Sequence, residues 1–573
     1  MTTTTSSLLA PSRGAADSSH VGDIKGAFGT IGAEDTGART SMSAKLKTLL
    51  AIVGPGLIVM CGDNDAGAFS TYGQAGQSYG TKLLWTFLLL VPVLYVNQEM
   101  VLRLGAVTGV GYAKLLLERF GKFWGAFSVI NLFVLNALTI ITEFIGIALA
   151  ASYLGVPKLV AVILAGLVIV LAASTGSLRR FERMAMIFCL GSLLLIPLYV
   201  LAHPPAGQMA SGFVTPTIPG GSGGLATAML LVIGIVGTTV APWQLFFQQS
   251  YVIDKRITPR FMRYEKADLW IGIGIVVIGG GALMGATAAA FAGAAHGQFT
   301  DAAGLAAGLG AYAGRAAGAV FAVALLNASM IGAFAVSLST AYAIGDVLGL
   351  KHSLHRGVKQ AKGFYAMYAA LIAVAAAVVL IPGSPLGLLT VGVQVLAGVL
   401  LPSATVFLLL LCNDKEVLGP WVNGKATNLL GAAVVGLLVM LSAILMISVL
   451  FGSVSSGQVI TIMLVALGAG VVTVAVIAGR RLHRRLTTSA VSASAVPASA
   501  VSASTVPVSR VPASAMAAAG RRAKENWRMP PLAMLAPVRM SGARRIGMLA
   551  MWLYLGAAFV MVIVRVVELA IGH

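Results

Sequence analysis

The sequence predicts an all-α integral membrane protein, from its composition, its repeated apolar segments and the placement of its basic residues. The chain has 573 residues, of which 58% are hydrophobic and only 10% are charged, and its mean hydropathy is +0.91. A soluble domain is about a quarter charged. Apolar segments of about 20 residues recur from residue 45 onward, and each is long enough to cross the hydrocarbon core of a bilayer.

The apolar segments define about 12 or 13 predicted membrane-spanning helices. We expect them near residues 45–77, 82–108, 124–154, 158–174, 184–203, 225–252, 268–294, 316–346, 364–381, 386–412, 427–451, 457–479 and 546–570. The last of these follows Arg544 and Arg545 and would be an extra C-terminal span.

The basic residues lie mainly in short loops between the predicted spans. A net charge of +20 would suggest nucleic-acid binding in a soluble protein, but here it follows membrane topology. With a cytoplasmic N-terminus, only Lys82, Lys158 and Arg315 lie in loops on the opposite side of the first twelve spans. The positive-inside rule therefore predicts a multi-pass protein of a bacterial-type inner (plasma) membrane, with lipid and not nucleic acid as its partner. The oligomeric state does not follow from the sequence.

The spans and the segments between them divide the chain into five regions. Residues 1–44 are polar, lack a signal peptide and are expected to form a disordered cytoplasmic tail. Residues 45–412 would form the core of ten spans, and residues 427–479 two further spans. Residues 480–545 are basic and then rich in Ala, Ser, Val and Pro, which indicates a flexible cytoplasmic linker. Residues 546–573 hold the extra span.

Ionisable residues inside a membrane span are costly, so each is a functional-site hypothesis. Asp63 and Asp65 lie in the first span, Glu99 in the second, Glu143 in the third, and Asp346 at the end of the eighth. We expect Asp346 to pair or cap locally.

Histidine and cysteine give no sign of a catalytic metal. All seven histidines lie in loops or tails, and Cys61, Cys189 and Cys412 lack zinc-site spacing. This pattern disfavours haem, a histidine-ligated metal and a membrane-embedded enzyme, so we expect no cofactor and no enzymatic activity.

Two spans are poor continuous helices. The first contains Gly62, Asp63-Asn64-Asp65 and Gly67, and the sixth contains Pro242, which should open the helix near Val240-Ala241. Interruptions five spans apart are typical of an inverted repeat of five plus five helices, with an ion site between the two unwound segments. A packing kink would explain the sixth span alone, but the paired interruption with two aspartates favours a site.

Several motifs resemble the Nramp divalent-metal transporter family over roughly residues 45–450. In the first span Asp65-Ala66-Gly67-Ala68 stands where the family has Asp-Pro-Gly-Asn. In the sixth, Gly237 to Gln244 stands where the family has Gly-Ala-Thr-Val-Met-Pro-His-Asn. Further matches are Gly54-Pro55-Gly56, Gln74-Ala75-Gly76, Gln98-Glu99-Met100, Glu143-Phe144-Ile145-Gly146 and Gln394. The resemblance implies a LeuT-like 5+5 inverted repeat with broken helices 1 and 6.

The departures from the family pattern are informative. Asp65 is retained, but the asparagine ligand is Ala68, the methionine ligand is Ala241, and Thr238 replaces an alanine. The histidine of the sixth span is Trp243, and an acidic residue three before Glu143 is Ile140. This combination looks like the Nramp-related magnesium transporters, a divergent branch.

Metal chemistry agrees with that resemblance. A thioether is a soft donor that helps Mn²⁺, Fe²⁺ or Cd²⁺ compete against abundant hard ions, whereas carboxylate, carbonyl and water oxygens suit Mg²⁺. Mg²⁺ keeps several waters and binds through one or two carboxylates. A roomy site around Asp65, with small Ala68 and Ala241, and with Thr238 and Gln394 as candidate polar partners, fits this demand.

The other acidic residues have open roles. Asp63 could converge with Asp65 in an unwound segment, although we favour Asp65 as the direct ligand. Glu143 shares a helix face with Asn136 and Thr139, which either lines a wet path or makes a buried pair. Glu99 either belongs to an inner gate or to a structural ion pair, which we favour.

These observations predict a secondary transporter that takes up Mg²⁺, and also Mn²⁺, by alternating access. Because Trp243 and Ile140 stand where the family has titratable residues, we expect this uptake not to be obligatorily coupled to protons. Two alternatives keep the fold: a proton-coupled Mn²⁺/Fe²⁺ importer, and a LeuT-like transporter of an organic solute. The anionic Asp65 argues against an acidic solute. A scaffold role is conceivable for residues 487–573 only.

Overall fold

The computed structural model describes residues 22–450 except 36, 220–223, 293–298 and 384–385, together with 523–535 and a few single residues beyond 457. The predicted spans at 457–479 and 546–570 therefore lie outside the described residues, apart from isolated positions. Among the described residues, nine helices are long and apolar enough to cross a membrane. The number is ten if α1 and α2, which are bent by 56°, form one span.

The first predicted span is divided into three helices. They are α1 (Met42–Ile52), α2 (Pro55–Asp63) and α3 (Ala66–Tyr79). Gly54 has a φ of 157° and Pro55 is the first residue of α2, so the chain turns there and restarts its helix. The sequence predicted the interruption at Asn64 and Asp65, which separates α2 from α3. It did not predict the bend between α1 and α2.

The sixth predicted span is divided into α11 (Gly224–Thr239) and α12 (Pro242–Asp254). Ala241 has extended backbone dihedrals, and Pro242 opens α12 because it has no N–H to give to the preceding turn. In the apolar stretch of this pair of helices, 94% is buried inside the protein, so the pair lies at the centre of the bundle. The interruption near Val240-Ala241 is therefore confirmed.

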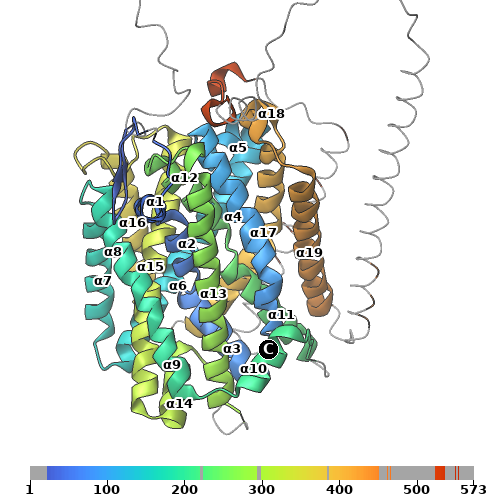
Figure 1. Ribbon diagram of the computed structural model, residues 1–573. Helices are drawn as coiled ribbons and strands as arrows, with labels where there is room; N and C mark the ends of the chain where they lie inside the picture. Colours follow the sequence, from blue (N-terminus) through green and yellow to red (C-terminus); the bar gives the residue numbers. More distant parts are fainter. Residues whose placement is uncertain are drawn as a thin grey trace, which may run out of the picture.

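The remaining helices surround these broken elements (Figure 1). The membrane-length group is α4 (Trp85–Thr108), α6 (Lys122–Tyr153), α8 (Leu178–Gly191) continued by η2 (Ser192–Leu194) and α9 (Leu195–Ala202), α13 (Met262–Ala290) preceded by η3 (Pro259–Phe261), α15 (Arg315–Leu348), α16 (Lys362–Val379), α17 (Leu386–Cys412) and α19 (Lys425–Leu450). The shorter helices are α5 (Tyr112–Phe120), α7 (Lys158–Ala173), α10 (Ala206–Val214), α14 (Ala302–Ala313), α18 (Lys415–Leu418) and the single turns η4 (Gly419–Trp421) and η5 (Leu532–Met534).

The packing places the site between the two halves of the chain. Helix α11 packs against α17, α6 packs against α15, and α13 packs along both α2 and α3. Figure 1 shows α5 and α18 at one end of the bundle, and α10 and α14 at the other. The loops at the α5 and α18 end are the ones that the basic residues predict to be cytoplasmic.

The predicted disordered tail is partly folded. Residues of β1 (Ile24–Lys25) and β2 (Thr30–Ile31) pair antiparallel, with Ile24 opposite Ile31. Arg179 and Arg183 of α8 donate hydrogen bonds to the carbonyls of Gly26 and Ala27 at 3.1 and 3.0 Å. The expectation of disorder is therefore wrong for the hairpin and for the start of α1, because two buried isoleucines and two arginines anchor a polar segment.

A part of the predicted linker also packs against the bundle. The indole Nε1 of Trp421 donates to the Lys524 carbonyl at 2.8 Å, and the Trp527 ring lies against Gly419. Met529 is only 2% exposed. Residues 523–535 are therefore docked on the α18 end, in contrast to the flexible linker expected for 480–545.

Candidate metal site

Asp65 lies buried at the interruption of the first span. It is the N-cap of α3, and its Oδ1 accepts a hydrogen bond from the Ala68 amide at 2.8 Å. The same oxygen accepts from the Thr238 hydroxyl at 3.4 Å. The positive end of the α3 dipole stabilises the carboxylate. The structure thus brings Asp65 and Thr238 together from the two broken spans, as the sequence predicted.

The small residues Ala68 and Ala241 are both buried beside these interruptions. Ala68 is in the first turn of α3, and Ala241 is the extended residue between α11 and α12. Neither side chain carries a donor atom for a metal, so an ion between the interruptions would meet carboxylate, hydroxyl, carbonyl and water oxygens.

Asp63 lies at the end of α2 and turns toward α12. It accepts a hydrogen bond from the Gln244 side chain, and its Oδ2 has no partner. Gln244 in turn accepts from Gln98 of α4 at 2.7 Å. Asp63 thus belongs to a network of side-chain amides with Gln244 and Gln98.

Gln394 of α17 packs directly against the first turn of α3. A Cβ atom on Gly67 would come within 1.9 Å of the Gln394 Nε2, so only glycine leaves room for this amide. The Nε2 group is buried and has no hydrogen-bond partner. Gln394 is therefore close to the Asp65 loop.

Glu143 of α6 reaches the same loop. Its Oε2 accepts from the Ala66 amide at 3.2 Å, its Oε1 has no partner, and its carboxyl group is close enough to interact with that of Asp65. Asn136, on the same helix, donates to the Thr340 hydroxyl of α15 at 2.9 Å. We call Asp63, Asp65 and Glu143 the ion-site cluster.

Glu99 and Asp346 make ion pairs away from this cluster. Glu99 pairs with Arg103 at 3.1 Å and with Lys266 at 3.0 Å, which agrees with the structural role that we favoured. Asp346 pairs with His352 at 3.2 Å, as expected for a local pair.

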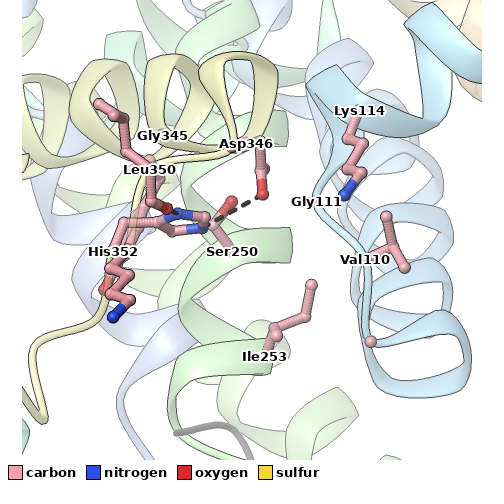
Figure 2. Close-up of a pocket in the computed structure, with 13 residues that line it drawn as sticks. Val110, Gly111, Lys114, Ser250, Ile253, Gly345, Asp346, Leu350 and His352 are labelled. Carbon is pink, nitrogen blue, oxygen red and sulfur yellow. Dashed lines mark hydrogen bonds and ion pairs between the residues drawn. The ribbon is translucent and has the colours of Figure 1, made fainter. Parts of the chain in front are cut away.

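Figure 2 shows the surroundings of Asp346, a cavity of about 330 Å³ between α5, α12 and the end of α15. Lys114 and Ser250 line this cavity together with Asp346 and His352. Burial opposes protonation of His352, but the Asp346 carboxylate outweighs it and raises the pKa of His352 to about 9. The histidine is therefore a cation at neutral pH, which makes this cavity unsuited to a dication.

A second buried charged cluster lies around Lys255, one of the many basic residues that the positive-inside pattern places on the cytoplasmic side. Lys255 is fully buried and contacts Glu182 at 2.5 Å and the carbonyls of Ile52 and Val53 at 2.7 and 2.9 Å.

Two acidic residues of α13 complete this second cluster. Asp268 accepts from the amides of Gly54 and Gly56 at 3.2 and 2.7 Å, and Glu265 is buried one turn before it. We call Glu182, Lys255, Glu265 and Asp268 the hinge cluster, because it surrounds the bend between α1 and α2.

No group of three or more histidine, cysteine or acidic side chains among the described residues has a geometry that could hold a metal ion.

A bundle with two centrally broken helices and a buried carboxylate between them defines the class of broken-helix membrane transporters. The family model described as natural resistance-associated macrophage protein-like (Nramp) matches residues 56–448, more than half of the chain, and the chain belongs to this family.

Curated relatives include two bacterial proteins named divalent metal cation transporter MntH. The protein of Ralstonia nicotianae is 29% identical over 398 residues, which cover 67% of this chain and 87% of the relative. The protein of Yersinia enterocolitica is 26% identical over 433 residues, covering 72% of this chain and 98% of the relative.

Solved structures show the same fold. The Eremococcus coleocola manganese transporter, in complex with an aromatic bis-isothiourea compound, superposes with a TM-score of 0.60 at 20% identity. The match covers 79% of this chain and 98% of that one. The predicted all-α, LeuT-like membrane fold with interrupted first and sixth spans is therefore confirmed, and so is the Nramp resemblance.

Proposed function

We propose that this chain takes up Mg²⁺, and also Mn²⁺, by alternating access around Asp65. As a member of the Nramp family it is a membrane transporter of divalent metal cations; the preference for Mg²⁺ and the mechanism are our proposal. The observation that carries it is a buried carboxylate between two interrupted helices, with alanines in place of the soft and amide ligands.

The donor set supports a hard ion. Asp65 and Thr238 supply oxygen, and the unwound backbone beside Ala241 supplies carbonyl oxygen. Oxygen ligands suit Mg²⁺, which also retains several waters when it binds. Alanine at positions 68 and 241 occupies less volume than the asparagine and methionine of the family pattern, which favours a partly hydrated ion. Asp63 and Gln394 would complete the polar surroundings without a sulfur donor.

The membrane potential can drive this uptake. Moving two charges through 100 mV gains about 4.6 kcal/mol. Trp243 and Ile140, which occupy positions of titratable residues in the family pattern, are both buried and apolar. We therefore propose that proton movement is not obligatory.

One observation favours a second function, a proton-coupled Mn²⁺/Fe²⁺ importer. The Glu143 carboxyl lies beside Asp65 and has an oxygen without a partner, so a proton could be carried next to the ion. In this reading Glu143 and Asn136 form a path along α6. A pH-sensitive dye inside liposomes distinguishes the two functions, because only the second acidifies the interior during metal uptake.

The decisive experiment measures Mg²⁺ flux into proteoliposomes under a potential. Asp65→Ala should reduce the flux to the level of empty liposomes, because the charged ligand is lost. The matched control is Asp35→Ala, which removes an exposed aspartate paired with Arg39 and should leave the flux unchanged. Retained flux in Asp65→Ala would reject the proposed site.

We further propose that the N-terminus lies in the cytoplasm of a bacterial-type inner membrane, which the charge of the loops supports. A membrane-impermeant thiol reagent should label an Arg315→Cys variant from outside whole cells, and an Arg180→Cys variant only after the membrane is opened. The reverse pattern would reject this orientation.

A further inference from the structure

A second cavity of about 360 Å³ lies between α4, the start of α13, the start of α19 and the docked residues 523–535. Its polar lining comprises Glu99, Arg103, Lys266 and Lys524, with Tyr95 and Trp421. It is separate from the ion-site cluster and lies near α18, at the end predicted to be cytoplasmic (Figure 1).

The charges of this cavity favour an anion. Arg103, Lys266 and Lys524 carry three positive charges, and Glu99 carries one negative charge. Glu99 is shared between Arg103 and Lys266 at 3.1 and 3.0 Å. The Lys524 ammonium lies 4.4 Å from the centre of the Trp421 ring, and no carboxylate in the described part of the chain pairs with it. A surplus of two positive charges remains.

Arg103 is held rigidly at the base of this cavity. It is nine-tenths buried and donates to the Trp421 carbonyl and to the Asn423 side chain, the latter at 2.6 Å. Its Nε–H group is buried without an acceptor. Such a fixed guanidinium does not have to be ordered when an anion binds, so the entropic cost of binding is low.

The start of α19 adds backbone donors. The helix begins at Lys425, and Ala426 and Thr427 of its first turn line the cavity. The first N–H groups of a helix lack intrahelical acceptors and, with the helix dipole, favour a phosphate.

The rim of the cavity continues into a surface suited to lipid. Trp270 and Ile271 of α13 are about half exposed, and Leu430 of α19 is 42% exposed. The Tyr95 and Trp270 rings stack with centroids 4.8 Å apart. Aromatic pairs of this kind are typical of the membrane–water interface, so the cationic cavity opens where headgroups meet acyl chains.

We propose that this cavity binds the phosphate headgroup of an anionic phospholipid, with the acyl chains along the exposed faces of α13 and α19. Basic pockets between membrane helices on the cytoplasmic side have this chemistry. The lipid would also join the docked C-terminal segment to the core, because Lys524 and Lys266 contact one headgroup from the two regions.

Native mass spectrometry of the full chain, titrated with phosphatidylglycerol or phosphatidylcholine, tests this proposal. Each basic residue near a membrane surface contributes about fivefold in affinity for anionic lipid, so Lys266→Gln with Lys524→Gln should weaken phosphatidylglycerol binding by about 25-fold. Phosphatidylcholine binding should not change. The matched control is Lys359→Gln with Lys362→Gln, two exposed lysines elsewhere on the same end, and it should bind phosphatidylglycerol like the unmodified protein.

An equal loss in the control pair, or no loss in the test pair, would overturn the proposal. If inorganic phosphate at equal concentration displaced the phosphatidylglycerol, the cavity would be a soluble-anion site and the lipid assignment would be wrong. Should the double variant aggregate, Lys524→Gln alone, on an exposed segment, should still lose about fivefold. These readouts do not depend on metal transport.

Discussion

The ion-site cluster and the hinge cluster are both buried and acidic, but they differ in positive charge. In the hinge cluster the Lys255 ammonium touches Glu182 and two backbone carbonyls. In the ion-site cluster, no lysine, arginine or histidine of the described residues pairs with Asp63, Asp65 or Glu143. Uncompensated carboxylates are costly in a dry interior. The hinge cluster carries its own cation, whereas the ion-site cluster lacks one, as expected of a site for a transported cation.

This difference separates two reasons for burying charge. A carboxylate with its own ammonium contributes to the folded structure, and removing either partner leaves an unpaired charge. A carboxylate without one lowers stability in return for binding. Mutations in the hinge cluster should therefore act mainly on stability, and mutations in the ion-site cluster mainly on transport.

The largest expected effect is on the hinge cluster. Lys255→Met leaves Glu182 and Asp268 buried without their cation, and should lower the free energy of unfolding by about 3–5 kcal/mol. Thermal unfolding followed by tryptophan fluorescence in detergent measures this. Lys359→Met, at an exposed position, is the control. A melting temperature equal to that of the unmodified protein would show that Lys255 is not a structural cation.

A smaller pH effect is expected at the Asp346–His352 pair, which also carries its own cation. The folded pKa of His352 is raised to about 9, so its contribution is fully present below the unfolded value of about 6.5 and is lost as the pH rises through 9. The contribution is on the order of 2–3 kcal/mol. At pH 7 the Asp346→Asn variant should melt at a lower temperature than the unmodified protein. At pH 10 the two melting temperatures should be equal. The same difference in melting temperature at both pH values would contradict the stabilising role of the Asp346–His352 pair.

The third effect concerns ion selectivity. Ala241→Met combined with Ala68→Asn adds a thioether and an amide to the ion site, and should shift competition uptake toward Mn²⁺ and Cd²⁺. Changes around a metal site typically alter affinity by about 10–100-fold, and we expect the lower end. Ala373→Met, on the exposed face of α16, is the control. Unchanged selectivity would refute the argument from donor softness.

The smallest effect is a gain in stability. Asp65→Asn keeps the N-cap of α3 but removes an uncompensated buried charge, so in metal-free buffer the protein should be more stable by about 1 kcal/mol. The same thermal unfolding assay measures it. A loss as large as that of Lys255→Met would mean that Asp65 is structural, and the contrast between the clusters would fail.

The helix interruptions could be predicted because they depend on local chemistry. Gly62, Gly67 and Pro242 weaken the helix wherever they lie, and an aspartate in such a segment needs a polar environment. The pattern of two interrupted spans also implies that the interruptions lie close together, but the contact of the Thr238 hydroxyl with Asp65 was not predicted.

The hinge cluster could not be predicted, because its members come from distant segments. Lys255 at a helix end usually belongs to a solvated loop, and only the approach of Glu182 and the α1 carbonyls makes it buried. The hairpin at Ile24–Ile31 and the docking of Trp527 have the same origin. Each is held by contacts with residues far along the chain, Arg179 and Arg183 for the hairpin and Gly419 for Trp527.

The ion-site cluster is tested most directly by anomalous diffraction from crystals soaked in Mn²⁺. We predict one strong peak beside the Asp65 carboxylate, between the interruption of the first span and Ala241, and its absence in Asp65→Asn crystals. A peak that persists in Asp65→Asn, or that lies at Glu182 and Asp268 instead, would contradict the account.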